Sequence, residues 1–231
     1  MTSLIPAQAE STEEKVDQIR VMIVDDDPWT TKALVHSLTR DPRIDALEPL
    51  HSGEEAFVSY AKLRPDVVLM DVNMPGGMSG VEATLMIREI DPAATILILT
   101  TVSPGPGIAR ALEAGAVAAL NKTASEDTIR ESVIRAAAGD DPRLLKNLAQ
   151  DIQICGDRLG QTSATIPTLT AVEKQVLHAI CEGLGYEEIA AAMSLSAWTV
   201  KTHTKNLRQK LHAENLAQLV VRALQYRFIS T

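Results

Sequence analysis

The feature that most constrains the fold of this chain is a regular alternation of short apolar runs with segments of helical spacing, over roughly its first 140 residues. The apolar runs predict five strands, the second weaker than the others, at 20–24, 44–50, 66–70, 94–99 and 117–120. Helical spacing between and after them predicts helices at 29–39, 54–63, 81–90, 108–114 and 125–138. Such alternation is typical of βαβ units. We therefore expect an α/β fold, with a doubly wound parallel sheet covered by helices on both faces.

The alternation ends at Asp140-Asp141-Pro142, which indicates a domain boundary. An amphipathic segment at 144–159 predicts a linker helix, and Thr170 and Glu173 have the spacing of a capping box that opens a helical region. Four helices are expected there, at 171–181, 186–193, 197–211 and 216–226. The predicted organisation is an α/β domain over 19–140, a helical and flexible linker over 141–166, and a separate all-α domain over 167–231.

The net charge changes sign along the chain. From residue 165 onward there are seven basic and five acidic side chains, whereas the preceding part has 15 and 25, so that its net charge is -10. An acidic N-terminal part and a mildly basic C-terminal part suggest different binding partners for the two parts. No apolar run is long enough to span a membrane, and acidic residues occupy the N-terminal stretch, so we expect a cytoplasmic protein with no membrane partner. The isolated Cys155 and Cys181 predict reduced thiols rather than a disulfide or zinc site.

Polar side chains follow the predicted strands where their carboxyl ends should meet. In open α/β sheets this edge holds the ligand site. The first strand ends in Asp25-Asp26-Asp27 and the third in Asp71, and the fourth and fifth are followed by Thr100 and by Asn121-Lys122. Clustered carboxylates repel one another unless a cation neutralises them, and an all-oxygen site suits Mg²⁺.

The residues at this edge could carry out phosphoryl transfer. Asp71, at the end of a strand expected to be central, is the candidate nucleophile that would form an acyl phosphate. Lys122 would pair with the added charge, and Thr100 would donate a hydrogen bond to a phosphate oxygen. Asp27 more simply caps the helix that follows it, expected at 29–39.

Residues 20–140 resemble the receiver domain of two-component response regulators, which has a flavodoxin-like fold. The motifs that carry the resemblance are Val-Asp25-Asp26, Leu-Met-Asp71-Val-Asn-Met-Pro, Leu-Thr100 and Lys122. The resemblance implies that a sensor histidine kinase phosphorylates Asp71. It also implies that Mg²⁺ is held by Asp25 or Asp26, by Asp71 and by the backbone carbonyl of Asn73.

The chain departs from the receiver pattern in three places. The loop at 74–80 is one residue longer than usual, and the loop after Thr101 contains Pro104 and Pro106. Ala119 stands three residues before Lys122, where receivers usually carry an aromatic residue that rotates inward on activation. These departures leave open a regulator that acts without phosphorylation.

The predicted helix at 197–211 has the features of a DNA-reading helix. Ser196 is its expected N-cap, and an inward face of Val200, Leu207 and Leu211 lies opposite a polar, cationic face. A helix of this kind can enter the major groove, where lysine reads guanine and phosphates supply most of the affinity. The outer face comprises Lys201, Thr202, Lys205 and Arg208.

Residues 168–231 resemble the LuxR-type helix-turn-helix domain of the NarL/FixJ family. The match includes Leu169-Thr170, Glu188-Ile189-Ala190 and Thr199-Val200-Lys201-Thr202-His203. The resemblance implies that Lys201, Thr202 and Lys205 approach bases, that Arg208 and Lys210 meet phosphates, and that Thr199 belongs to the same DNA-binding set. We expect Trp198 to pack inside the domain.

The resulting hypothesis is a non-enzymatic transcription regulator that binds double-stranded promoter DNA as a homodimer after phosphorylation. The helix at 216–226 is the candidate dimer seam, and RNA polymerase is a further candidate partner. Two alternatives stay open. One is a phosphorylation-independent regulator, which Ala119 favours. The other is an Mg²⁺-dependent phosphohydrolase, in which Asn73 would stand where such enzymes commonly place an acidic residue.

Overall fold

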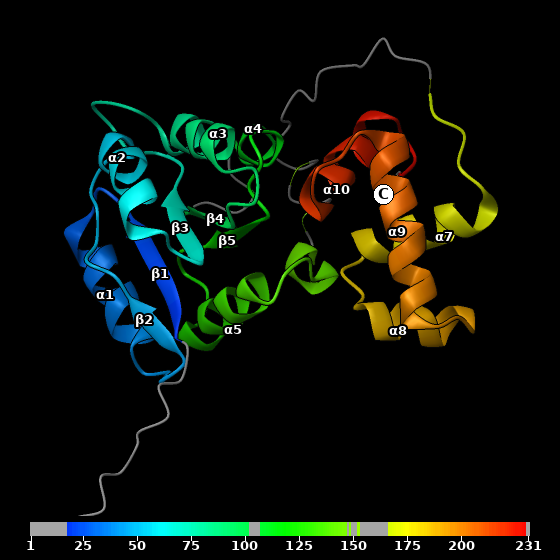
Figure 1. Ribbon diagram of the computed structural model, residues 1–231, viewed down its shortest axis with the longest axis horizontal. Helices are drawn as coiled ribbons and strands as arrows, with labels where there is room; N and C mark the ends of the chain where they lie inside the picture. Colours follow the sequence, from blue (N-terminus) through cyan, green and yellow to red (C-terminus); the bar gives the residue numbers. More distant parts are fainter. Residues whose placement is uncertain (1–17, 102–106, 147, 149–151, 153–165, 230–231) are drawn as a thin grey trace, which may run out of the picture.

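The computed structural model describes residues 18–101, 107–146, 148, 152 and 166–229. Its N-terminal domain contains a five-stranded sheet in which every neighbouring pair is parallel, in the order β2-β1-β3-β4-β5 (Figure 1). The strands are β1 (Ile19–Val24), β2 (Ile44–Ala46), β3 (Val67–Asp71), β4 (Ile96–Thr100) and β5 (Ala118–Asn121). This order confirms the predicted doubly wound sheet, with β3 at its centre.

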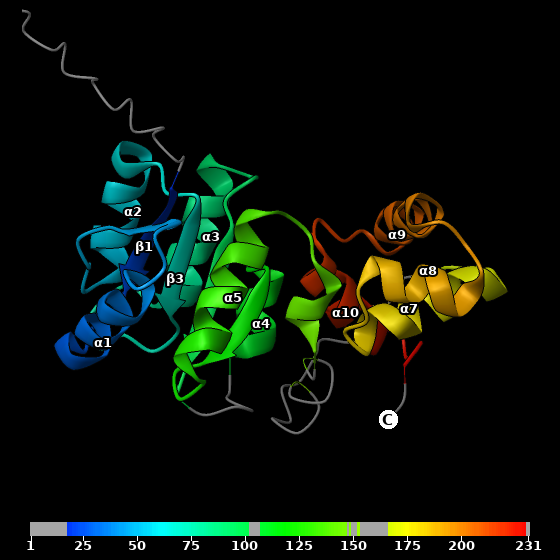
Figure 2. The ribbon, with the colours of Figure 1, turned by 90° about the horizontal axis from the view of Figure 1, so that it is seen from below.

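Helices cover both faces of the sheet (Figures 1 and 2). One face carries α1 (Pro28–Leu38) and α5 (Glu126–Ala137), and the other carries α2 (Gly53–Leu63), α3 (Gly80–Ile90) and α4 (Ile108–Glu113). Every residue of β3 and β4 is buried. Both strands therefore read as continuous apolar runs, as expected for a sheet with two covered faces.

The edge strand β2 is shorter than the predicted 44–50. Regular pairing with β1 ends at Ala46, and beyond it only an isolated bridge joins Val24 and Leu50. Pro49 has no N–H to donate to a ladder, which explains the interruption. The other strands and the helices agree with the predicted ranges to within about two residues.

The C-terminal part is helical, as predicted. A short 3-10 turn, η1 (Pro142–Leu145), precedes four helices, α7 (Ala171–Cys181), α8 (Tyr186–Met193), α9 (Ala197–Leu211) and α10 (Leu216–Gln225). Of the predicted linker helix, η1 covers the start, and Leu148 and Ile152 are helical and buried. The rest of that helix, Cys155, and the prolines at 104 and 106 lie outside the described residues. No described helix is long and apolar enough to cross a membrane.

The two domains contact each other directly. In both ribbon views α10 lies beside the N-terminal domain, next to α4 (Figures 1 and 2). Nearly all of α10 is buried, with Leu219, Val220 and Val221 completely inaccessible to solvent. The apolar core on the α4 side of the sheet therefore continues into the helical domain.

Candidate functional site

Three carboxylates lie together at the carboxyl edge of the sheet. Asp25 and Asp26 follow β1, and Asp71 ends β3, the neighbouring strand. Each offers an oxygen within 4.8 Å of the others, with Asp25 and Asp71 buried and Asp26 exposed. A buried cluster of carboxylate oxygens that is open to solvent on one side fits a hard divalent cation such as Mg²⁺.

Lys122 reaches both buried carboxylates. Its Nζ lies 2.7 Å from Oδ2 of Asp25 and 2.9 Å from Oδ2 of Asp71. The backbone of Lys122 is fixed by its N–H, which donates to the carbonyl of Thr100 at 2.8 Å. Thr100 is itself 5% exposed at the end of β4. The structure therefore brings the Lys122 ammonium, Thr100 and the three carboxylates to one edge of the sheet.

Burial and pairing oppose each other in this cluster. Burial raises the pKa of Asp71, the Asp25 carboxylate raises it further, and Lys122 only partly counters this. Burial by itself would lower the pKa of Lys122, but the ion pairs with Asp25 and Asp71 raise it overall. Lys122 thus stays charged and serves as the positive partner that two close carboxylates need.

Two neighbouring residues act through local hydrogen bonds. Asp27 caps α1, because its carboxylate accepts from the backbone N–H groups of Trp29 and Thr30 at 3.0 and 3.3 Å, as predicted. Asn73 is exposed, and its N–H donates to Oδ1 of Asp71 at 3.3 Å. This contact holds one oxygen of the Asp71 carboxylate in place.

Glu54, for which no role was predicted from the sequence, anchors the long loop at 74–80. Its carboxylate accepts from the N–H of Met78 at 2.7 Å and so joins this loop to the first turn of α2. The same hydrogen bond lowers the pKa of Glu54. Acidic residues are common in the first turn of a helix, where they stabilise its N-terminus. The position of Glu54 in the sequence therefore does not indicate that it binds the loop.

Gly80 allows α3 to approach the backbone of Asp71. A β-carbon at Gly80 would collide with the carbonyl oxygen of Asp71, a main-chain atom that cannot move away freely. We expect Gly80→Ala to destabilise the N-terminal domain by about 3 kcal/mol, measured by urea unfolding. Gly77→Ala is the control and should be destabilised less, because the nearest atoms to its β-carbon belong to the flexible side chain of Glu54, whose displacement costs at most its hydrogen bond to Met78. Equal stability of the two variants would contradict this close packing.

The helix α9 has the predicted cap and faces. Ser196 Oγ accepts from the N–H of Thr199 at 3.0 Å, and Val200, Leu207 and Leu211 are fully buried. The outer face presents Lys201 and Lys205 to solvent, and Nζ of Lys201 lies 5.4 Å from the ring centre of Tyr186. The helix therefore keeps a cationic face outside the domain core.

Three of the predicted DNA-binding residues have partners within the helical domain itself. The Thr199 hydroxyl bonds that of Ser196 at 2.8 Å as part of the cap. Nζ of Lys210 lies 2.8 Å from the buried carboxylate of Glu173, which also completes the capping box of α7. The hydroxyl of Thr202 donates to the carbonyl of Trp198 at 2.9 Å, a bond along the surface of α9 itself.

The prediction that Trp198 packs inside the domain is wrong. Its side chain is 76% exposed at the second position of α9. The inward positions of this helix are already filled by smaller residues, Val200 and Thr204 in its first turns, so the indole stays outside.

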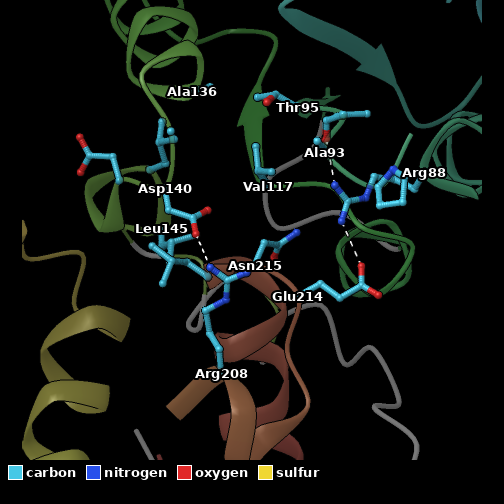
Figure 3. Close-up of a pocket in the computed structure, with 16 residues that line it drawn as sticks. Arg88, Ala93, Thr95, Val117, Ala136, Asp140, Leu145, Arg208, Glu214 and Asn215 are labelled. Carbon is cyan, nitrogen blue, oxygen red and sulfur yellow. Dashed lines mark hydrogen bonds and ion pairs between the residues drawn. The ribbon is translucent and has the colours of Figure 1, made fainter. Parts of the chain in front are cut away.

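A pocket lies where the helical domain meets the N-terminal domain (Figure 3). At one side Nη1 of Arg208, a predicted phosphate contact, lies 2.6 Å from the carboxylate of Asp140, and at the other Arg88 pairs with Glu214 at 3.0 Å. Asn215 donates to the carbonyls of Gly115 and Ala116, at 3.1 and 3.3 Å. These contacts could not be predicted from the sequence, because they depend on how the two domains are placed.

Comparison with known proteins supports both domain assignments. Residues 21–134 match the response regulator receiver domain, and residues 167–223 match the luxR family of bacterial regulatory proteins. Response regulator protein VraR of Staphylococcus aureus is 31% identical over 214 residues, which cover 91% of this chain and 99% of VraR. The two-domain arrangement of the sequence is thus shared along nearly the whole length of a curated relative.

Solved structures of response regulators and their domains are also similar to this chain. A LuxR-family two-component response regulator from Aurantimonas is 32% identical with a TM-score of 0.50, covering 53% of this chain and 86% of that one. The receiver domain of NarL from Mycobacterium tuberculosis is 26% identical with the same TM-score, over 53% of this chain and 98% of that one. RcsB of Salmonella enterica, solved on its promoter, shares the fold at 22% identity and a TM-score of 0.52, over 88% and 98% of the two chains. This chain therefore belongs to the response regulators, as a receiver domain joined to a DNA-binding domain of the LuxR family.

Proposed function

We propose that Asp71 accepts a phosphoryl group from a sensor histidine kinase and that this event controls binding of the helical domain to promoter DNA. The observation that carries the first half is the contact of one ammonium, Lys122, with the buried carboxylates of Asp25 and Asp71. An anion that arrives at Asp71 meets a charged lysine already in place, so little reorganisation is needed.

The proposed transfer uses an oxygen of Asp71 as the nucleophile. This oxygen attacks phosphorus, the bond from phosphorus to the donor histidine nitrogen breaks, and the nitrogen keeps the bonding electron pair. Lys122 turns from the Asp71 carboxylate to the new phosphoryl oxygens, and the Thr100 hydroxyl donates to another of them. The product is an acyl phosphate that adds about -1.5 to -2 charges to the edge of the sheet.

The cluster also fits Mg²⁺. Its ligands would be the carboxylates of Asp25, Asp26 and Asp71 and the carbonyl of Asn73, a set of oxygen donors in keeping with this cation. The chemistry that bound Mg²⁺ supplies is screening of the negative charge on an incoming phosphoryl group.

A labelling experiment with acetyl phosphate separates the phosphoacceptor from the phosphohydrolase alternative. We expect the whole chain, with Mg²⁺, to retain close to one phosphoryl group per molecule, and EDTA to prevent this. Steady release of inorganic phosphate from small phosphate esters, without a retained phosphoryl group, would instead favour the hydrolase. Asn73, two residues after the nucleophile, supports the first outcome because an amide is a poor general base.

The proposed DNA-binding face is the outer side of α9, with Lys201, Thr202 and Lys205 toward bases and Arg208 toward a phosphate. Thr199 and Lys210 would join them only by exchanging their present partners in the cap and the capping box. A single small helix-turn-helix makes few contacts, so we propose that two copies bind two half-sites as a homodimer. Bound in this way, the protein could also contact RNA polymerase.

The helix α10, proposed as the dimer seam, is covered by α4 of its own chain. Its polar N-terminus donates hydrogen bonds from Asn215 to Gly115 and Ala116 and from Gln218 to the carbonyl of Glu113. Pairing of two copies through α10 therefore requires the domains to separate. Separation would also free Arg208 from Asp140.

We expect Asn215→Asp to open this interface. The carboxylate can still cap α10 by accepting from the N–H of Gln218, but it cannot donate to the two carbonyls. Loss of two buried hydrogen bonds should raise the DNA affinity of the unphosphorylated chain about tenfold and increase its radius of gyration in X-ray scattering. Unchanged affinity and unchanged scattering would show that the contacts do not restrain the domains.

A further inference from the structure

The exposed indole of Trp198 shares one side of α9 with two proposed DNA-contacting residues. Trp198, Thr202 and Lys205 follow one another at intervals of four and three residues, which places them on one stripe of a helix. The hydrogen bond from Thr202 to the carbonyl of Trp198 joins the first two. The buried residues Val200 and Leu207 lie on the opposite side. Trp198 therefore projects away from the domain core, in the same direction as the proposed reading residues.

The charges around Trp198 favour a polyanion as its partner. The 15 residues of α9 include no aspartate or glutamate, and they include the cations Lys201, Lys205, Arg208 and Lys210. An aromatic ring flanked by lysines suits the major groove, in which phosphates border the base edges. A protein partner with an apolar face would offer no counter-charges to Lys201 and Lys205, which face solvent on this side of the helix.

We propose that Trp198 is a specificity-determining residue that packs its ring against the 5-methyl group of a thymine in the major groove. This proposal rests on the proposed DNA-binding function of α9. The N-terminal residues of a recognition helix come closest to base edges, and Trp198 is at the second position. The thymine methyl is the apolar group on the base edges of that groove, so an indole selects for it.

Trp198 can be followed by its own fluorescence, because the chain has only two tryptophans. In Trp29→Phe it is the sole indole. The probe is a set of duplexes selected from a randomised pool by the Trp29→Phe chain treated with acetyl phosphate. Binding of a selected duplex should change the indole emission and reduce quenching by iodide at least threefold, since the ring moves from solvent into the groove.

Replacement of single thymines by deoxyuridine then locates the contact. At one position per half-site, loss of the methyl should lower affinity about fourfold in the Trp29→Phe chain. The same replacement should have no effect in Trp29→Phe/Trp198→Ala, whose overall affinity should be about tenfold weaker. Val172→Ala, another exposed apolar residue of the domain, is the control and should bind like its parent.

The outcomes distinguish a failure of the proposed role of Trp198 from a failure of the proposed DNA-binding function. Strong binding of the selected duplexes with unchanged iodide quenching, or with the same thymine dependence in the Trp198→Ala chain, overturns the role of Trp198 and leaves DNA binding intact. Protection from iodide that depends on protein concentration without DNA also overturns it, in favour of contact between copies. Failure of every chain to select a duplex overturns the proposed function and this inference together.

Discussion

Asp71→Asn should abolish covalent phosphorylation of the chain by acetyl phosphate or by a phosphorylated kinase. The amide is a poor nucleophile and cannot form the acyl phosphate, while its similar shape leaves the packing of β3 unchanged. Lys122 still has Asp25 as a partner, so the variant should fold normally. A phosphate-affinity gel or radiolabel should show the signal fall from near one equivalent to background.

Asp45→Asn is the matched control for this experiment. Asp45 is exposed on the edge strand β2 and has no part in the carboxylate cluster, so labelling of this variant should equal that of the wild type. Labelling that survives in Asp71→Asn would place the acceptor elsewhere and refute its assignment.

The double substitution Lys201→Ala/Lys205→Ala should weaken DNA binding by about 10²-fold to 10⁴-fold. Both side chains are exposed on the outer face of α9, so their loss should not disturb the core. Because both lysines are proposed to face bases rather than phosphates, the slope of log affinity against log salt should change by less than about one per lysine removed. Fluorescence anisotropy with a duplex selected from a randomised pool, at several salt concentrations, measures both effects.

Lys174→Ala provides the comparison in the same domain. Lys174 is exposed on α7, so this variant loses one charge without touching α9. Its affinity should fall by no more than about threefold, the nonspecific effect of one charge. A double variant that binds as well as Lys174→Ala would show that α9 is not the reading helix.

The fold could be predicted from the sequence because its signals are local. Apolar runs such as 66–70 and 94–99 are buried strands, and caps such as Ser196 and Asp27 start helices through bonds to residues two or three positions away. The short edge strand β2 deviates because a single proline interrupts its ladder. The placement of the two domains could not be predicted, since Asn215 and Gly115 are 100 residues apart and neither belongs to a recognisable motif.

The meeting of the acidic residues and Lys122 at one edge of the sheet could be predicted from the sequence. In a parallel sheet the carboxyl ends of all strands lie at the same edge. Lys122 and Asp25 are far apart in sequence, but β1, β3, β4 and β5 deliver their ends to one place. The position of Trp198 was not predictable from its hydrophobicity. Helical spacing would have placed it opposite Val200 and Leu207, but an aromatic residue in a small domain usually belongs to the core.

The proposed control of DNA binding by phosphorylation of Asp71 is tested most directly by the DNA affinity of the whole chain with and without a phosphodonor. Acetyl phosphate with Mg²⁺ should raise the affinity of the wild type for a selected duplex at least tenfold and leave Asp71→Asn unchanged. Equal affinities in all four measurements would contradict control by phosphorylation and would favour a regulator that binds DNA regardless of the state of Asp71.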